Sequence, residues 1–313
     1  MQEENLKNYF VNKKYANTTQ EVELSPLGGE SQSHLNYKAL TPTGVLVARV
    51  AKEVNLLSFS NLSDEYTLLK LIEKHTVGPR VFAMDLEGFD MPLLLEEYLE
   101  GKTFNECEQL PEEVFGTTIK LIARTSAISL TQDEFPFKYT YTTYRTNFRA
   151  WEMRIEEIRN AIGDEGVAGL VDVTEKVRTA LEPLEKTFHA IKPEFVYNDV
   201  HPGNIMLLKT GDVRFIDWQK VSLGDPSFML ALFAKRFGHL WGMDAGAFTE
   251  RSLKAYQSEK DTPSTFEELF RARILERTVS DAVWTTWANV KKGIKGDPEK
   301  QAKYIEETKR LLM

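Results

Sequence analysis

The chain has 313 residues, of which 42% are hydrophobic and 27% are charged, as is typical of a folded globular protein and not of a disordered one. Its formal net charge of −8 argues against nucleic acid as a partner, because phosphate binding needs clustered Lys and Arg, and it is compatible with a cationic small substrate. The single cysteine, Cys107, excludes a disulfide within the chain and fits a reducing cytoplasm.

The first hundred residues are predicted to be mostly strand. Residues 21–27, 34–40 and 45–50 are short apolar or alternating runs, separated by Gly and Pro turn signals, which is typical of an antiparallel meander. A helix is expected next, with Ser63 as its N-cap and Glu65 in its first turn. Two further strands are predicted at residues 81–84 and 93–96.

Beyond residue 100 the apolar pattern becomes helical. Residues 148–162 step by three and four up to Gly163, and residues 177–188 and 266–287 show the same periodicity. Two strands, at 205–208 and 213–216, interrupt these helices. We therefore expect an α+β protein with an N-terminal lobe at 1–99 and a larger, mainly helical lobe at 100–313, and a ligand site in the cleft that two lobes form.

The strongest local signal is the segment YNDVHPGN, residues 197–204, which is followed after a hairpin by Ile216, Asp217 and Trp218. Phosphoryl transfer needs a carboxylate that orients and deprotonates the attacking hydroxyl, and oxygen ligands for Mg²⁺. A segment with Asp199 and Asn204 supplies both, and the hairpin returns a second carboxylate, Asp217, to the same metal. A plain polar loop before a hairpin would explain the Asp and Asn alone, but not the whole pattern.

These residues, with Leu223-Gly224-Asp225-Pro226 downstream, resemble the aminoglycoside phosphotransferase and choline kinase family, which has a protein-kinase-like fold. The resemblance extends over nearly the whole chain, but only the segment 196–226 is specific. It implies an ATP- and Mg²⁺-dependent kinase of a small hydroxylated molecule. It also implies that Asp199 is the catalytic base and that Asn204 and Asp217 bind Mg²⁺.

The N-terminal lobe matches the same family in order. Arg49 lies where such enzymes place the cation that binds the α and β phosphates, and Glu65 matches the acid that pairs with it. Lys52 competes for this role, but it has the opposite phase to the strand residues that Arg49 follows. Either charge can also be a simple surface feature. The segment from Gly28 to Ser33 takes the place of the phosphate-covering loop, through Gly28, Gly29 and Ser31.

The segment LEEYLEG, residues 95–101, matches the connector between the lobes. The resemblance implies that adenine bonds to the carbonyl of Glu97 and the amide of Leu99. Two positions depart from the family pattern: Tyr197 stands where many relatives have His, and Met229 stands where an Asp commonly braces the catalytic loop. Asp225 is retained.

Other aromatic and histidine residues are more simply interpreted as packing residues than as catalytic or binding residues. We interpret His201 as a residue that packs the loop and Trp218 as a core residue. Trp284 and Trp287 lie three apart on a helix and could enclose a quaternary ammonium, although core packing is the commoner role.

The leading hypothesis is a cytoplasmic small-molecule kinase with no nucleic-acid or membrane partner. Residues 1–10 lack the pattern of a secretory signal, and the longest apolar run, residues 228–234, is too short to span a bilayer. An aminoglycoside-like amino sugar, choline or ethanolamine, and an uncharged metabolite all stay open as acceptors. A non-catalytic nucleotide-binding regulator is the alternative, and a protein kinase is a weaker one. The sequence leaves the choice of ATP or GTP and the oligomeric state open.

Overall fold

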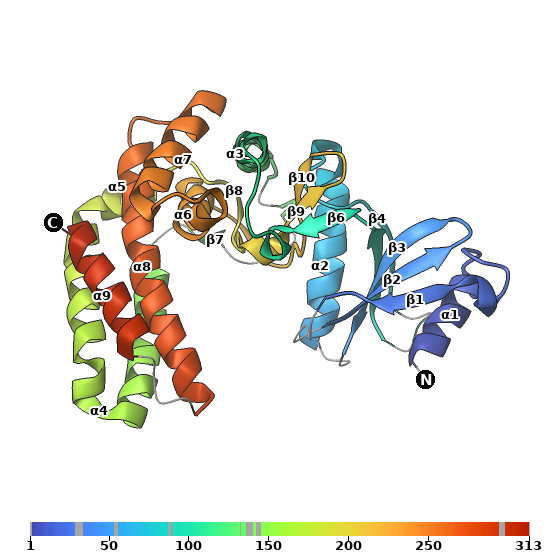
Figure 1. Ribbon diagram of the computed structural model, residues 1–313, viewed down its shortest axis with the longest axis horizontal. Helices are drawn as coiled ribbons and strands as arrows, with labels where there is room; N and C mark the ends of the chain where they lie inside the picture. The colour runs from blue at the N-terminus through green and yellow to red at the C-terminus, as the bar shows by residue number, and fades with distance from the viewer. Residues whose placement is uncertain are drawn as a thin grey trace. The chain divides into compact units, whose positions relative to one another are not determined.

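The computed structural model describes residues 2–28, 34–52, 56–86, 89, 91–131, 133–135, 140–141, 145–293 and 298–312. The chain forms two compact units (Figure 1). The first comprises Met1–Glu108, Leu130–Lys138 and Pro202–Val221, and the second comprises Gln109–Ser129, Tyr139–His201 and Ser222–Met313. Residues 202–221 therefore pack with the N-terminal unit. The predicted lobes, 1–99 and 100–313, are continuous in sequence and place this segment in the second lobe.

The first unit is built on a five-stranded antiparallel sheet in the order β1-β2-β3-β5-β4. Its strands are β1 (Glu23–Pro26), β2 (His34–Thr41), β3 (Gly44–Ala51), β4 (Val81–Asp85) and β5 (Leu93–Glu97). The predicted meander is confirmed, because β1 pairs with β2 and β2 pairs with β3 over its whole length.

One face of this sheet is covered by a helix that the periodicity did not predict. Helix α1 (Gln2–Asn12) has a polar sequence, but it buries Leu6, Tyr9 and Phe10. These side chains join a core with Ala39, Ala48, Val50, Leu93 and Leu95 from β2, β3 and β5. A spacing of three and four residues places them on one side of the helix. Residues of opposite phase on the same strands, Arg49 and Glu96 among them, are thereby directed to the other face.

The second helix of this unit corrects one expectation. Helix α2 spans Leu56–Ile72, so Ser63 lies inside it and not at its N-cap, and Glu65 lies in its middle. The stretch from Leu56 to Asn61 contains no Gly or Pro that would stop a helix. The carbonyl of Ser63 accepts a hydrogen bond from the hydroxyl of Thr67 at 2.9 Å, a bond that is common in helix interiors.

A small three-stranded sheet completes the first unit, in the order β10-β9-β6. Its strands are β6 (Gly101–Thr103), β9 (Ile205–Leu208) and β10 (Val213–Phe215), as predicted for the hairpin. A Cβ atom at Gly101 would lie 2.1 Å from the carbonyl oxygen of Leu207, so only glycine allows β6 and β9 to approach this closely.

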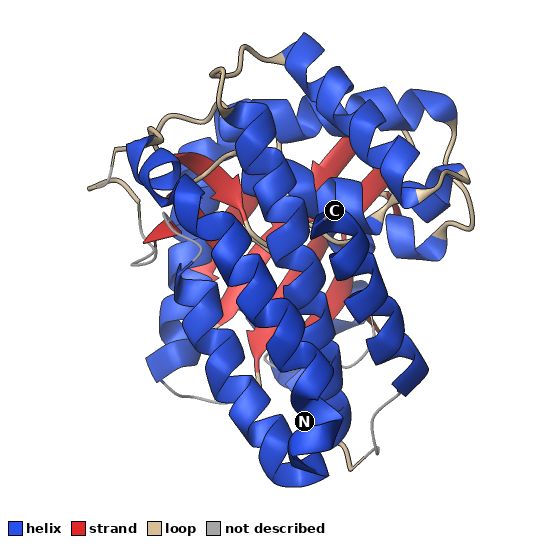
Figure 2. Cartoon of the chain, turned by 90° about the vertical axis from the view of Figure 1, so that its left-hand side faces the viewer, coloured by secondary structure: helices blue, strands red, loops and turns tan. Residues whose placement is uncertain are grey.

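The second unit is mainly helical (Figure 2). Its described helices are α3 (Glu112–Ser126), α4 (Arg145–Leu181), α5 (Glu185–Ala190), α6 (Ser227–Arg236), α7 (Ala245–Glu259), α8 (Phe266–Lys291) and α9 (Pro298–Leu312). Three short strands, β7 (Thr140–Tyr141), β8 (Glu194–Tyr197) and β11 (Val221–Gly224), pair in the order β7-β11-β8. The predicted break at Gly163 is present, because this residue has φ +81° and interrupts α4.

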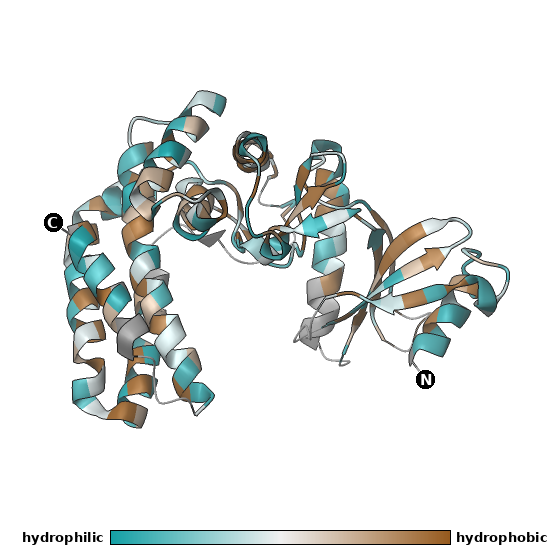
Figure 3. Ribbon diagram, in the orientation of Figure 1, coloured by the Kyte–Doolittle hydropathy of each residue, from teal (hydrophilic) through white to brown (hydrophobic). Residues whose placement is uncertain are grey.

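One hydrophobic core cluster of the second unit lies between α4 and α8. It includes Trp151, Ile158, Val177, Val279 and Val283, and hydrophobic positions alternate with hydrophilic ones along both helices (Figure 3). The predicted core role holds for Trp287, which packs against this cluster, but Trp284 is 41% exposed. A small antiparallel sheet followed by a larger, mainly helical region is the predicted α+β fold. No helix in the described part of the chain has both the length and the apolar character needed to cross a membrane.

Candidate active site

The first unit contains a charge cluster centred on Arg49. This side chain leaves the face of β3 opposite the α1 core and is only 5% exposed. Its Nη1 donates to Glu65 Oε1 at 2.6 Å, and its Nη2 donates to Asp217 Oδ1 at 3.4 Å. Glu96 Oε2 lies 3.8 Å from Nη1, within ion-pair distance. One guanidinium thus faces three carboxylates from α2, β5 and the end of the hairpin.

Burial and charge act in opposite directions in this cluster. Burial lowers the pKa of Arg49, but the three carboxylates outweigh it and raise that pKa above its usual value. Burial raises the pKa of Glu65, although Arg49 opposes this. Burial also raises the pKa of Glu96 to about 7, again against the effect of Arg49. The guanidinium is therefore a fixed positive charge, and two of its acidic neighbours are destabilised as anions by their burial.

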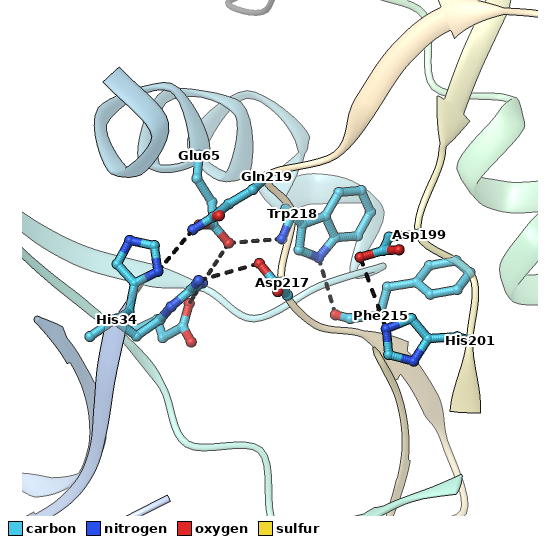
Figure 4. A network of polar contacts seen from close by, with 10 residues as sticks. His34, Glu65, Asp199, His201, Phe215, Asp217, Trp218 and Gln219 are labelled. Carbon is cyan, nitrogen blue, oxygen red and sulfur yellow. Dashed lines mark hydrogen bonds and ion pairs between the residues drawn. The ribbon is translucent and has the colours of Figure 1, made fainter. Parts of the chain in front are cut away.

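Glu65 also binds the backbone after the hairpin. Its Oε1 accepts a hydrogen bond from the amide of Trp218 at 2.8 Å, in addition to the bond from Arg49 (Figure 4). The indole of Trp218 is fully buried, and its Nε1 donates to the carbonyl of Phe215 at 3.1 Å. The ion pair between Arg49 and Glu65 that the resemblance implied is present, and Trp218 is a core residue, as predicted.

A cavity of about 660 Å³ opens beside this cluster within the first unit. Six of the residues singled out from the sequence line it: Gly28, Arg49, Glu97, Leu99, Asn204 and Asp217. Glu65 is fully buried behind Arg49 and does not line the cavity. Gly28 has φ +73°, a conformation that glycine adopts without strain. Gly29 and Ser31 lie outside the described residues.

The end of β5 forms another wall of this cavity. The amide of Glu97 donates to the carbonyl of Arg80 at 2.8 Å, and the Glu97 carboxylate accepts a bond from the amide of Arg80 at 3.1 Å. Arg214 adds an ion pair to the same carboxylate at 3.4 Å. These contacts hold Glu97 in place at the end of β5, on the wall of the cavity.

Asn204 and Asp217 reach the cavity from the two ends of the hairpin. A turn of 3₁₀ helix, η5 (Pro202–Asn204), precedes β9, and the carbonyl of Asn204 accepts a bond from the amide of Ile216 at 3.0 Å. Asp217 has φ +59°, an uncommon conformation for a residue other than glycine and one that recurs at functional sites. Its side chain is 46% exposed, so this carboxylate is accessible to a ligand.

This donor pair suits a magnesium ion. An amide oxygen and a carboxylate are hard ligands, and Mg²⁺ in nucleotide sites takes only one or two protein ligands besides phosphate and water. Among the described residues, no group of three or more His, Cys, Asp or Glu side chains could hold a metal ion by itself. Asn204 and Asp217 are thus residues that could hold Mg²⁺ together with phosphate oxygens and water.

Asp199 lies in the second unit, in the loop after β8. His201 Nε2 lies 3.9 Å from Asp199 Oδ2 (Figure 4). The side-chain amide of Asn198 donates to the hydroxyl of Ser222 at 3.0 Å, and Arg236 Nη1 donates to the carbonyl of Val200 at 3.0 Å. The residues on both sides of Asp199 are therefore held by side chains from β11 and α6.

The two departures from the family pattern, Tyr197 and Met229, are both fully buried side chains. Met229 is fully buried in α6, where an acid would be costly. Asp225 is also buried and accepts bonds from Arg273 Nε at 2.8 Å and from the amide of Ser227 at 2.9 Å. Arg236, which holds the loop at Val200, is itself paired with Asp281 at 3.5 Å.

The sequence analysis missed three residues around this site. Glu96 lines the cavity beside Glu97, and the signal was an acid directly after the apolar run Leu93–Leu95 in the same strand. His34 is 3% exposed, and burial, with Arg49 nearby, lowers its pKa to about 4, so it is neutral at pH 7. No local sequence pattern indicated a role for Arg236, because the residue it contacts, Val200, lies 36 positions earlier in the chain.

Trp284 and Trp287 on α8 do not form an empty aromatic cage. Arg154 stacks over Trp284 at 3.5 Å from the ring centroid and lies 5.3 Å from that of Trp287. The two indoles meet edge to face at 5.5 Å. A cation from the chain itself already occupies the face that a quaternary ammonium would need.

Comparison with known proteins gives the family. The family model described as the phosphotransferase enzyme family matches residues 23–269. A search of curated proteins found no match.

Solved structures share the fold at low sequence identity. Choline kinase LicA from Streptococcus pneumoniae has 18% identity and a TM-score of 0.65, and the match covers 99% of this chain and 98% of the other. Plasmodium vivax ethanolamine kinase has 12% identity and a TM-score of 0.63, covering 98% and 87%. A thermostable aminoglycoside phosphotransferase, APH(4)-Ia in complex with AMP-PNP and hygromycin B, has 13% identity and a TM-score of 0.63, covering 98% and 97%.

The fold is therefore the protein-kinase-like fold predicted from the sequence. Because the family model spans most of the chain, including both the Arg49 cluster and the segment 197–217, the protein belongs to the phosphotransferase enzyme family.

Proposed function

We propose that the protein is an ATP- and Mg²⁺-dependent kinase that transfers the γ-phosphoryl group to a hydroxyl of a small molecule. The observation that carries this proposal is the buried Arg49, held between Glu65 and Asp217 on the wall of a large cavity. A fixed guanidinium beside a carboxylate that can bind metal is the arrangement that nucleotide phosphates need.

The cavity has the size and the chemistry of a nucleotide site. Its volume of about 660 Å³ is in the range of ligand pockets. Apolar residues line it, among them Val47 of β3, Met206 of β9 and Ile216 directly after β10, together with Glu97 and Leu99. Apolar walls suit the faces of a planar base, and backbone groups suit its edge. The solved relative with AMP-PNP binds an ATP analogue on the same fold.

Each of the predicted site residues has a separate role in the proposed phosphoryl transfer. Asn204 and Asp217 would hold Mg²⁺, which neutralises the charge on the phosphates when it is bound. Arg49 would bind the α and β phosphates, and Glu65 keeps its guanidinium in place. Asp199 would accept the proton of the acceptor hydroxyl, with its loop held by Arg236 and Ser222 on either side.

The acceptor is proposed to be a small hydroxylated metabolite, and a cationic one is favoured. The solved relatives include a choline kinase, an ethanolamine kinase and an aminoglycoside phosphotransferase bound to hygromycin B. The net charge of −8 also favours attraction of a cation. Because Arg154 already covers Trp284, we do not place the acceptor at the aromatic pair on α8.

A kinase assay tests the proposal directly. ADP release from Mg·ATP is measured against amino alcohols, amino sugars and neutral sugars, for the wild type and for Asp199→Asn. We expect turnover with at least one acceptor and a loss in kcat of roughly 10²- to 10⁴-fold in the variant, with nucleotide binding retained, because only the base is removed. Asp212→Asn, an exposed acid in the turn between β9 and β10, is the matched control and should keep full activity.

The alternative is a nucleotide-binding regulator without catalysis. The observation that favours it is Met229 in place of the bracing acid. The same assay separates the two: nucleotide binding without turnover on any acceptor, and no effect of Asp199→Asn, would support the regulator and end the kinase proposal.

A further inference from the structure

The proposed metal ligand Asp217 has a backbone conformation that needs support from its neighbours. Its φ of +59° lies in the left-handed region, which residues other than glycine seldom adopt and which persists only where surrounding contacts hold it. Its side chain is 46% exposed, so packing around the carboxylate contributes little to its position. The direction in which the carboxylate points is therefore set largely by how the adjoining backbone is held.

The backbone next to Asp217 is held by two hydrogen bonds within the first unit. The amide of Ile216 donates to the carbonyl of Asn204 at 3.0 Å, and the amide of Trp218 donates to Glu65 Oε1 at 2.8 Å. These bonds fix one residue on each side of the metal ligand. The side chain of the following residue makes a further contact.

This following residue, Gln219, contacts a buried histidine of the N-terminal sheet. Its Nε2 lies 3.4 Å from His34 Nδ1, a long hydrogen bond (Figure 4). His34 is the first residue of β2 and is only 3% exposed. Because burial lowers the pKa of His34 to about 4, the imidazole is neutral at pH 7, and one ring nitrogen can accept a bond from the amide.

The contact joins two parts of the chain that the proposed reaction uses together. His34 and Gln219 are 185 residues apart. His34 directly follows the segment 28–33, which is predicted to cover the phosphates, and Gln219 stands two positions after the predicted Mg²⁺ ligand. Two apolar side chains would fill the same space without the cost of burying polar groups. A polar contact here favours a role in orienting the metal ligand over a role in packing alone.

We propose that Gln219 and His34 are positioning residues for the metal site, and that their contact holds Asp217 in the orientation that binds Mg²⁺ together with the nucleotide phosphates. Groups that orient a metal ligand influence metal affinity although they do not touch the metal. When the contact is lost, the backbone after Asp217 gains freedom, and ordering it on binding costs affinity for the metal. This inference rests on the proposed function, because it needs a nucleotide and Mg²⁺ in the site.

A merely structural role would have a different signature. A contact that only stabilises the first unit changes the melting temperature and changes nucleotide binding by the same factor with and without Mg²⁺. A contact that positions the metal ligand changes binding with Mg²⁺ only. The ratio of the two dissociation constants measures how strongly the metal and the nucleotide favour each other's binding, so it separates the two roles.

The test is a measurement of this ratio by calorimetry. Dissociation constants for AMP-PNP are measured with saturating Mg²⁺ and with EDTA for the wild type, Gln219→Leu, His34→Leu and the double variant. We expect the affinity gained from Mg²⁺ to fall roughly three- to tenfold in Gln219→Leu, the range for a neutral hydrogen bond, with binding in EDTA nearly unchanged. Gln20→Leu, the same substitution at an exposed residue of the first unit, should leave the ratio unchanged.

The double variant tests whether the two residues act through their contact. If they do, it should lose no more of the Mg²⁺ effect than Gln219→Leu loses alone, because the contact is already absent there. His34→Leu changes a buried residue, so its folding is checked by circular dichroism. Gln219→Leu changes a partly exposed residue and gives the same readout if His34→Leu does not fold.

Two kinds of failure are distinguishable. An unchanged ratio in Gln219→Leu, or losses in the two single variants that add in the double variant, would overturn the positioning role and leave the kinase proposal intact. No binding of AMP-PNP to the wild type at millimolar concentration, or binding that Mg²⁺ does not strengthen, would overturn the proposed function itself, and this inference with it.

Discussion

Arg49 is the residue on which the phosphate site depends. In Arg49→Lys the positive charge stays, but a single ammonium cannot donate in the fixed geometry that reaches both Glu65 and Asp217. We expect the free energy of unfolding to fall by about 1–3 kcal/mol, because a buried carboxylate loses a charged hydrogen bond. The dissociation constant for nucleotide should rise about tenfold. Urea denaturation and calorimetry measure the two effects.

Arg271→Lys is the matched control for this change. Arg271 also donates to two carboxylates, Glu250 and Glu267, but its side chain is 48% exposed. Surface ion pairs contribute little, so the stability should change by less than about 1 kcal/mol, and nucleotide binding should not change. Equal effects of the two substitutions would contradict the importance of burial at Arg49.

Among the structural elements, strand β6 depends on the absence of a side chain at Gly101. In Gly101→Ala the new Cβ would lie 2.1 Å from a backbone oxygen of β9, so one of the two strands must move. We expect a loss of about 1–3 kcal/mol in the free energy of unfolding. Gly116→Ala in α3, where a Cβ meets nothing within 4 Å, should instead stabilise the protein by roughly 0.5–1 kcal/mol. Thermal melts measure both effects: the Tm should fall in Gly101→Ala and rise in Gly116→Ala.

Helix α6 supplies the support of the Asp199 loop, through Arg236. In Arg236→Met the carbonyl of Val200 loses its bond from Arg236, and Asp281 loses its ion pair with Arg236. We expect kcat to fall roughly 10- to 100-fold while KM for ATP stays near its original value, because a displaced base affects the chemical step and not nucleotide binding.

Lys235→Met provides the comparison on the same helix. Lys235 pairs with Glu307 of α9, so its loss should lower stability without a specific effect on kcat. Parallel losses of activity in the two variants would show that α6 contributes only through folding.

At the scale of the whole molecule, the first unit is not continuous in sequence. Residues 202–221 supply β9 and β10, the partners of β6, and also the amide of Trp218 that bonds to the fully buried Glu65. A fragment of residues 1–108 should therefore lack a cooperative thermal transition. A fusion of 1–108 to 202–221 through a flexible linker should regain one. Circular dichroism melts of both fragments and the full chain decide this, and a cooperative melt of 1–108 alone would contradict it.

The sequence by itself determined the elements with a strong local pattern. The alternation of β2 and β3, the long apolar face of α8 and the break at Gly163 follow from periods of two and 3.6 residues and from glycine. The segment 196–226 indicated the family, since Asp199, Asn204 and Asp217 lie within one short loop and hairpin and Leu223-Gly224-Asp225-Pro226 follows. The first residues of α2 were missed, because Ser63 is as compatible with a helix interior as with a cap.

Only the tertiary structure decided which charges meet. Arg49 and Asp217 are 168 residues apart, and the ion pair between them exists because a hairpin from late in the chain packs into the N-terminal unit. The burial of Glu96 and of His34, and the support of Val200 by Arg236, have no local signature for the same reason. Periodicity shows which side of an element is apolar. The partner of each polar group is set by packing between segments that are distant in sequence, and this packing determines burial and hydrogen bonding, and through them affinity and catalysis.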